Sequence, residues 1–256
     1  MAYTVKHYGW IPDIPDQRDH LYAAPVATLM TLPAKVDLRG QCPPVYDQGQ
    51  LGSCTGNGIA AAIQFDRMKA GYTPDFVPSR LFIYYNERVI EHTVESDSGA
   101  MIRDGIRSVA KKGDCPEDQW PYDIVKFADK PPSSCYSDAL KYRAVQYQRL
   151  VQSINQMKGC LASGYPFVFG FSVYESFESA EVAQSGVVPI PNTASEQWVG
   201  GHCVLAVGYD DEQQRFIIRN SWGEQWGMAG YCTMPYAYLN DRNLADDFWT
   251  IRVIAA

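Results

Sequence analysis

The chain has 256 residues, which is enough for one two-lobed domain or two small ones with a sizeable apolar core. Its 22 basic and 29 acidic residues give a formal net charge of -7, which argues against broad electrostatic attraction to nucleic acid. No stretch approaches the roughly 18 apolar residues of a membrane helix, and no signal peptide is readable, so we expect no membrane partner. Localisation stays open between the cytoplasm and non-classical export.

The first 31 residues differ from the rest of the chain. Pro12 and Pro15 remove backbone donors and favour extended geometry in the residues before them. We therefore expect residues 1–31 to form an extended segment, too short to be a domain, ahead of a domain at residues 32–256. One interpretation is a terminus draped over the surface. The other, in which the segment docks on the domain, depends on a resemblance described below.

A glycine-rich turn that runs into a helix carries Cys54. From Ile59 onward, three alanines with high helix propensity and apolar residues on one side predict a buried helix. If the helix begins near Cys54, its unpaired N–H groups and positive dipole end favour the thiolate, which is the nucleophilic form of cysteine. Taken alone, Cys54 is more simply explained as a small buried hydrophobic residue, as most free cysteines are.

Two further helices are predicted, so that residues 45–122 form a mainly helical lobe. The first covers residues 79–88, where Ser79 follows a proline and can cap the helix. The second covers residues 100–112, with apolar residues at helical spacing and Gly113 in the position of a C-cap.

From about Ala144 the apolar period changes from helical toward two. Segments rich in aromatic and β-branched residues predict strands at 167–173, 203–209, 216–219, 231–234 and 248–254. Residues 144–256 are therefore expected to form a mostly antiparallel sheet or barrel. The predicted fold class is α+β, with one helical lobe and one β lobe.

The cysteines give no sign of a metal centre. No pair of Cys or His has the close CxxC or HxxxH spacing of metal ligands, so we expect neither a metal nor another cofactor. Cys115 and Cys135 flank the junction between the lobes and could form a disulfide, worth about 3 kcal/mol by loop entropy. Cys160, Cys203 and Cys232 lie in apolar runs and are interpreted as free core residues.

The β half supplies the partners that a nucleophilic cysteine needs. His202 enters a strand about 150 residues after Cys54, and Asn220 follows the next strand. Such a site requires a base within hydrogen-bond reach and a third group that orients the base. Because Cys54 belongs to the helical lobe and the other two belong to the β lobe, the reaction is expected in the cleft between them.

At these residues the chain resembles the papain family of cysteine peptidases. The family's Gln-Gly, three variable positions and Ser-Cys are matched at Gln48-Gly49 and Ser53-Cys54. Its later Asn-Ser-Trp-Gly is matched at residues 220–223, and its Trp-Gly and Gly-Tyr follow at 226–227 and 230–231. The resemblance covers roughly residues 32–256. It implies a papain-like two-lobed fold with the active site in the cleft, and cysteine endopeptidase activity on peptides or proteins.

The resemblance assigns roles to four catalytic residues. Cys54 would attack an amide carbonyl as a thiolate, His202 would take its proton and later protonate the leaving amine, and Asn220 would hold the imidazole. The Gln48 side chain and the Cys54 backbone N–H would stabilise the oxyanion. Trp222 would cover the His–Asn hydrogen bond. The simpler interpretations are an exposed loop amide for Gln48 and plain core packing for Trp222.

The substrate-binding residues also come from the resemblance. Backbone at Ser98, Gly99 and Ala100 would pair with the substrate chain, strand against strand. The pocket for the residue two before the cut would be apolar or small and without charge, so it should prefer hydrophobic side chains. Its lining residues would be Met101, Gly170, Gly200 and Cys203, with Gly201 directly before the histidine.

Members of this family are often made as precursors whose N-terminal segment lies in the substrate cleft. Residues 1–31 contain no counterpart of the helical prodomain common in the family. We nevertheless expect this segment to dock on the enzyme and cover part of the cleft. The docking residues would be Trp10, Ile11, Ile14 and Leu21. The departures from the family pattern involve no catalytic group: they are Leu51, Thr55 and Gly201.

Two other classes of function stay open. An acyltransferase or a non-peptide amidase would use the same thioester intermediate. An inactive binding module would keep the fold without the reaction, although the intact set of catalytic groups argues against it.

Overall fold

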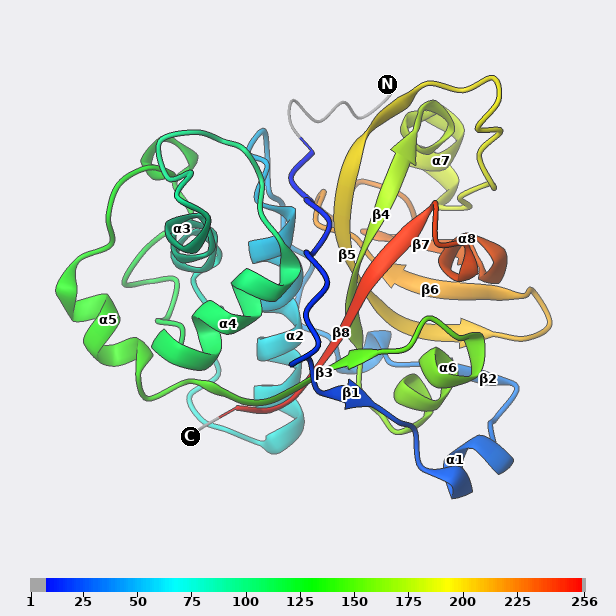
Figure 1. The fold of residues 1–256 in the computed structure, drawn as a ribbon, viewed down its shortest axis with the longest axis horizontal. Coiled ribbons are helices and arrows are strands. Elements are labelled where there is room, and N and C mark those ends of the chain that lie inside the picture. Colours follow the sequence, from blue (N-terminus) through cyan, green and yellow to red (C-terminus); the bar gives the residue numbers. More distant parts are fainter. Residues whose placement is uncertain (1–7, 255–256) are drawn as a thin grey trace.

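The computed structural model describes residues 8–254, and its helices and sheet form two lobes on either side of one long helix (Figure 1). The helices are α1 (Val26–Met30), α2 (Cys54–Ala70), α3 (Arg80–Glu91), α4 (Ile102–Lys112), α5 (Ser133–Ala139), α6 (Ile154–Ala162), α7 (Ala180–Ser185) and α8 (Tyr236–Asn240). Short 3-10 helices are η1 (Arg39–Gln41), η2 (Ile124–Lys126) and η3 (Glu175–Glu178). Within the described residues, no helix is both long and apolar enough to span a membrane.

The helices begin and end where the local sequence favours it. Ser79 caps α3 by accepting a hydrogen bond from the N–H of Phe82 at 3.2 Å. Gly113, with a φ of 75°, ends α4, and Gly71, with a φ of 71°, ends α2. The caps predicted at Ser79 and Gly113 are therefore confirmed.

The strands form one sheet in the order β1-β3-β8-β4-β5-β6-β7, with β2 paired to β5. They are β1 (Leu21–Tyr22), β2 (Lys35–Asp37), β3 (Ala144–Leu150), β4 (Phe167–Tyr174), β5 (Trp198–Asp210), β6 (Arg215–Arg219), β7 (Tyr231–Pro235) and β8 (Ala245–Ile254). All the named pairs are antiparallel except β1 with β3. This helical lobe with an antiparallel sheet confirms the predicted fold class.

Helix α2 joins the two lobes. Its residues from Cys54 to Arg67 are all buried, and it packs against α3, β5 and β8. Figure 1 shows α2 between the other helices of its lobe and the sheet. The main apolar cluster accordingly combines α2 residues such as Ile59 and Phe65 with residues of the strands. The first residue of α2 therefore lies where the two lobes meet.

Residues 8–13 run along the junction between the lobes, beside α2 and β5 (Figure 1). Two short elements follow. The first is β1, which pairs with β3, and the second is α1, which lies before the domain begins. Ile14 and Leu21 do not dock as predicted, since 69% and 62% of their surfaces are exposed. Their apolar side chains face solvent, and other residues of the segment make its contacts.

The cysteines are all free thiols. The disulfide considered between Cys115 and Cys135 is therefore not formed. Both side chains are buried in one small apolar cluster with Phe82, so they act as packing residues.

Candidate active site

The three predicted catalytic residues come from three different elements. Cys54 is the first residue of α2, His202 lies within β5, and Asn220 directly follows β6. The His202 Nε2 and the Asn220 Oδ1 are 2.8 Å apart. Asn220 Oδ1 also accepts a hydrogen bond from the N–H of Ser221 at 2.9 Å, which fixes the oxygen end of the amide. Because an amide oxygen only accepts, Nε2 must carry the proton, and Nδ1 of the neutral ring is the basic nitrogen.

The imidazole of His202 is enclosed by aromatic rings. The Trp222 ring stacks on it with centroids 5.0 Å apart, and Phe171 meets it edge-on at 5.6 Å. The ring is fully buried, and Nδ1 has no hydrogen-bond partner among the described residues. Burial lowers the pKa of His202 to about 4, and the bond to Asn220 opposes that shift. His202 is therefore neutral in this structure.

Cys54 is fully buried and is also held in its neutral form. Burial raises the pKa of the Cys54 thiol to about 12, while backbone hydrogen bonds with Cys203, Gly9 and Thr55 act in the opposite direction. The Gly9 peptide is thus one of the backbone groups next to the Cys54 sulfur, and it packs against Gly52, two residues before Cys54. No hydrogen bond joins Cys54 to His202 among the described residues. The structure therefore contains a thiol and an imidazole that have not exchanged a proton.

Gln48 lies inside the protein, so its interpretation as an exposed loop amide is wrong. Its exposed fraction is 0%. Its Oε1 accepts from the Ser221 hydroxyl at 2.6 Å, and its Nε2 donates to the Leu51 carbonyl at 3.0 Å. The amide is thus fixed between the Cys54 turn and the segment after Asn220. One of the two Nε2 hydrogens stays available for a further acceptor.

The group that covers Cys54 is the chain's own residues 8–13. Trp10 N–H donates to the Gly201 carbonyl at 2.9 Å, and Ala100 N–H donates to the Gly9 carbonyl at 2.7 Å. Ile11 N–H then donates to the Ala100 carbonyl at 3.0 Å. The resulting bridge between Trp10 and Ala100 is parallel. The predicted substrate-pairing backbone therefore already binds a peptide, which is the N-terminal segment.

The close approach of this segment depends on glycine. A Cβ at Gly9 would lie too close to the carbonyl oxygen of Gly52, and one at Gly99 would overlap the Gly9 backbone. Gly99 also has a φ of 75°, which side chains rarely adopt. Glycine is therefore required at both positions for the segment to lie this close to the cleft.

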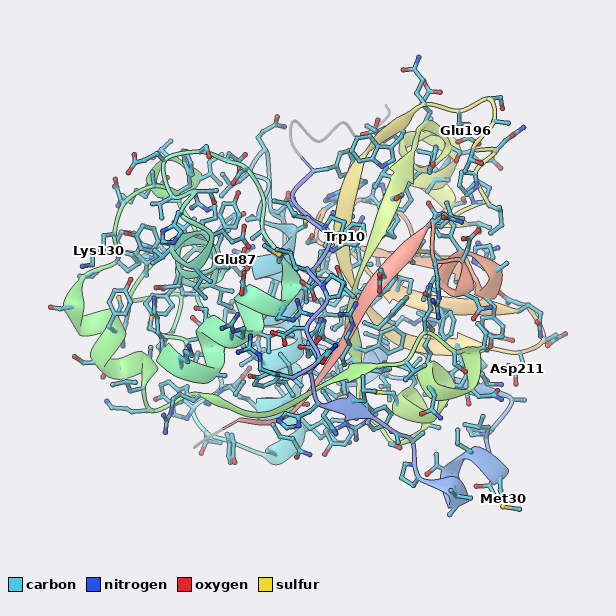
Figure 2. The ribbon with its side chains drawn as sticks, viewed as in Figure 1. Trp10, Met30, Glu87, Lys130, Glu196 and Asp211 are labelled. Atoms are coloured by element: carbon cyan, nitrogen blue, oxygen red, sulfur yellow. The ribbon has the colours of Figure 1, made fainter. Side chains whose placement is uncertain are left out.

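The ring of Trp10 fills part of the predicted pocket and lies at the boundary between the lobes (Figure 2). It lies against Gly170 and Gly201, since an added Cβ at either would meet its ring. Its Nε1 donates to the buried carboxylate of Asp247 at 3.1 Å. The pocket was predicted to contain no charged residue. That prediction is wrong, because Asp247 lies there and no pattern in the sequence indicated it.

The other predicted binding residues are distributed around this pocket. Gly200 lies against Tyr8, and Met101 precedes α4, with its N–H donating to Glu91 Oε1 at 2.7 Å. The sulfur of Cys203 instead packs near Gly58 of α2, toward the interior. Ser98 makes a local bond, from its hydroxyl to the Gly99 carbonyl at 3.3 Å.

Asp13 anchors the segment on the far side of Trp10. It is buried, and its carboxylate accepts from the Arg103 N–H at 3.0 Å and from Trp249 Nε1 at 2.9 Å. The Arg103 guanidinium in turn pairs with Asp19, and this ion pair is also largely shielded from solvent. Charged residues, and not Ile14 or Leu21, therefore hold this part of the segment.

Thr55 replaces the aromatic residue that usually follows the nucleophile in the family. Its hydroxyl donates to Glu87 Oε1 at 2.5 Å, and Glu87 is fully buried. Burial raises the pKa of Glu87 well above its ordinary value, and the bond from Thr55 opposes that shift. This contact ties the first turn of α2 to α3, the helix that carries the Glu87 labelled in Figure 2.

Comparisons with known proteins agree with this arrangement. The family model for the papain family cysteine proteases matches residues 32–249. An uncharacterised peptidase C1-like protein of Acanthamoeba polyphaga mimivirus is 43% identical over 273 aligned residues, covering 97% of this chain and 88% of that protein. Cysteine proteinase 1 of Entamoeba histolytica is 27% identical over 212 residues, covering 79% of this chain and 63% of that protein.

Solved structures give the same answer. Xylellain, a cysteine protease from Xylella fastidiosa, is 49% identical with a TM-score of 0.91, and the match covers 99% of this chain and 98% of that one. The digestive procathepsin L 3 of Tenebrio molitor shares the fold at 20% identity and a TM-score of 0.71, over 92% of this chain and 75% of that one. The chain therefore belongs to the papain family of cysteine proteases and is a hydrolase of that family, as its motifs indicated.

Proposed function

We propose that the chain is a cysteine endopeptidase that uses Cys54, His202 and Asn220, and that its own residues 8–13 hold the site closed. The observation that carries the proposal is the His202 ring, whose Nε2 is bound by Asn220 at 2.8 Å while the basic Nδ1 has no hydrogen-bond partner. The same peptide lies next to both reacting groups, since the Gly9 backbone adjoins the Cys54 sulfur and the Tyr8 ring centroid lies 5.8 Å from that of the imidazole.

The reaction follows from these groups. Nδ1 of His202 takes the thiol proton, and the Cys54 thiolate attacks the carbonyl carbon of the peptide bond. The imidazolium then gives its proton to the leaving amine, which breaks the C–N bond and leaves a thioester. Water attacks the thioester with His202 again acting as base, and the acid product and the thiol are released. Asn220 holds the ring throughout by its bond to Nε2.

The oxyanion needs donors that are in position before the reaction. The backbone N–H of Cys54 belongs to the first turn of α2, where helical N–H groups have no partner within the helix. The Nε2 of Gln48 is fixed close by through its bonds to Leu51 and Ser221 and has one hydrogen left to donate. These two groups are the proposed oxyanion hole.

The backbone contacts of the segment support a peptide as the substrate. Ala100 bonds to the segment through both its N–H and its carbonyl, and Gly201 bonds through its carbonyl. These groups bind the backbone of a peptide and not its side chains, which suits an enzyme that accepts many sequences. The pocket that holds the Trp10 ring supports a large apolar side chain two residues before the cut.

The segment itself is proposed to be an inhibitor, because it presents the wrong atoms to the nucleophile. Attack requires a carbonyl carbon about 3–3.5 Å from the sulfur. The carbonyl of Gly9 instead accepts from the Ala100 N–H at 2.7 Å, and the segment runs parallel to residues 99–101. Cys54 and His202 are also both fully buried in the covered site, and burial disfavours the thiolate–imidazolium pair that the reaction needs.

An irreversible epoxide inhibitor of cysteine peptidases tests the reaction. We expect the inhibitor to label Cys54 and to stop cleavage of a fluorogenic peptide by the full-length protein. Cys54→Ala and His202→Ala should lose both properties, whereas Cys42→Ala, a partly buried cysteine outside the site, should keep both. Labelling that persists in Cys54→Ala, or peptide cleavage that persists in His202→Ala, would overturn the assignment.

A further inference from the structure

Tyr8 occupies a second site in the cleft, next to the imidazole of His202. Its ring lies edge-on to that imidazole with centroids 5.8 Å apart, and 6.3 Å from the Trp222 ring. It also lies against Gly200, where an added Cβ would be 2.6 Å from the Tyr8 Cβ. Its hydroxyl donates to Oε1 of Glu178 at 2.6 Å. The site therefore has aromatic and glycine walls and a carboxylate at its end.

This site lies on the side of the cleft where the leaving group departs. Trp10 fills the pocket for the residue two before the cut, and Gly9 lies on the nucleophile. Tyr8 is the next residue of the segment, and its ring lies beside those of His202 and Trp222. In the proposed reaction the imidazole protonates the leaving amine, so the residue that follows the cut must lie beside His202. Tyr8 therefore stands where the side chain of that residue would lie.

Within the part of the chain that the structure describes, no neighbour in its own loop donates a hydrogen bond to the carboxylate of Glu178. Glu175 and Glu196, the second of which Figure 2 labels, both accept backbone N–H bonds from neighbouring loop residues. Among the described residues, Tyr8 is the hydrogen-bond donor to Glu178, and no ion pair involves this carboxylate. Residues 159–214 contain no lysine or arginine, so the chain around the site supplies no basic side chain to pair with it.

We propose that Glu178 is a specificity-determining residue for the position directly after the cut. It selects side chains that reach across the aromatic walls and end in a hydrogen-bond donor, which are lysine, arginine and tyrosine, and it rejects glutamate and aspartate by like-charge repulsion. This inference rests on the proposed peptidase function. Tyr8 of the closed state occupies the site in the same way as the favoured substrates.

Peptides that differ only in the residue after the cut test the inference. We would compare kcat/KM for lysine, tyrosine, phenylalanine and glutamate at that position, using the full-length protein with Gly9→Ala so that the cleft is open. A hydrogen bond to a charged group predicts a preference of about 10-fold for lysine and tyrosine over phenylalanine, with glutamate below phenylalanine. Phenylalanine fills the same walls without a donor and is the reference substrate.

Two substitutions separate this role from a structural one. Glu178→Gln should remove the preference for lysine over phenylalanine and relieve the rejection of glutamate, with phenylalanine cleavage unchanged. Glu181→Gln removes a nearby exposed carboxylate of α7 and should leave all four rates as they are. An unchanged order of substrates in Glu178→Gln overturns the inference while leaving the peptidase function standing. Failure of every enzyme to cleave any peptide or to react with the epoxide overturns the proposed function itself.

A second measurement does not need a substrate. Tyr8→Phe removes the donor that the closed state presents to Glu178, so it should speed epoxide labelling of Cys54 about 10-fold in the otherwise unchanged protein. The same change in a Glu178→Gln background should have a smaller effect, because the charged acceptor is already gone. Equal effects of Tyr8→Phe in both backgrounds would contradict the direct contact on which the inference depends.

Discussion

Replacing Gly9 by alanine should open the active site, because no side chain fits at this position. A Cβ there would lie closer than 3.0 Å to the backbone carbonyl oxygen of Gly52, which has no flexible end that could move aside. On its other side the Gly9 backbone passes so close to Gly99 that a Cβ added there would overlap it. The added methyl group can therefore be accommodated only if the segment leaves the cleft.

The size of the effect follows from the contacts that are lost. The segment gives up the bonds from Ala100 to Gly9, from Trp10 to Gly201 and from Ile11 to Ala100. Each such bond contributes about 0.5–1.5 kcal/mol, so the loss is roughly 2–4 kcal/mol. At 1.4 kcal/mol per factor of ten, the balance between open and closed forms shifts by about 30- to 700-fold.

The assay is alkylation of Cys54 by iodoacetamide at pH 7, with intact mass as the readout. In the closed form, burial raises the pKa of Cys54 to about 12 and lowers the pKa of His202 to about 4, so thiolate is scarce. Opening lets water solvate both groups, and we expect alkylation at least 10-fold faster, together with higher peptidase activity. Gly40→Ala is the matched control, since its Cβ would meet nothing within 4 Å. Equal alkylation rates in wild type and a folded Gly9→Ala protein would refute the argument that residues 8–13 protect the cysteine.

The catalytic and folding assignments give further tests. Gln48→Ala should lower kcat by about 10²–10³-fold with KM nearly unchanged, and a normal kcat would remove Gln48 from the oxyanion hole. Asn220→Ala should lower kcat and move the alkaline limb of its pH profile to lower pH, because the bond to Asn220 raises the pKa of His202, and an unaltered profile would contradict that role. Ser79→Ala should reduce the free energy of unfolding by about 0.5–2 kcal/mol in urea titrations, because α3 loses its cap, whereas Ser137→Ala at an exposed position of α5 should change it little.

Features that depend on neighbouring residues could be predicted from the sequence. Ser79 and Gly113 cap their helices because a hydroxyl and a left-handed glycine act within one turn of the chain. The alternation of apolar residues similarly located the strands that became β4 to β8. Cys54, His202 and Asn220 could be proposed as a catalytic set because the reaction itself limits the residue types that can take part.

Features that depend on contacts between distant residues could not be predicted. Apolar character pointed to Ile14 and Leu21 as anchors, yet Asp13 is the buried residue, because the Arg103 N–H and the Trp249 indole compensate its charge. The pairing of β8 with β4 places Asp247 at the pocket, and no local sequence pattern predicts that pairing. A buried carboxylate is recognisable only once its partners are known.

The contact between Asp13 and Asp247 makes docking of the segment sensitive to pH. Asp247 Oδ2 accepts from the Asp13 N–H at 2.7 Å and from Trp10 Nε1 at 3.1 Å. Burial, with the neighbouring Asp13 as the next cause, raises the pKa of Asp247 to about 7, and burial also raises the pKa of Asp13. Arg149, which donates to Asp247 Oδ1 at 2.8 Å, acts in the opposite direction but does not cancel the shift.

When the segment leaves, these carboxyl groups meet water and their pKa values return toward about 3.9. Groups whose pKa is higher in the docked state stabilise docking fully below about pH 4, and that contribution is lost as pH rises through about 7. We therefore expect the segment to dock less tightly as the pH rises from about 4 to about 7. The measure is the alkylation rate of wild type divided by that of Gly9→Ala at each pH, which cancels the titration of the thiol itself. Asp13→Asn should flatten this ratio, and a ratio that falls with pH would show that the carboxyl pair does not govern docking.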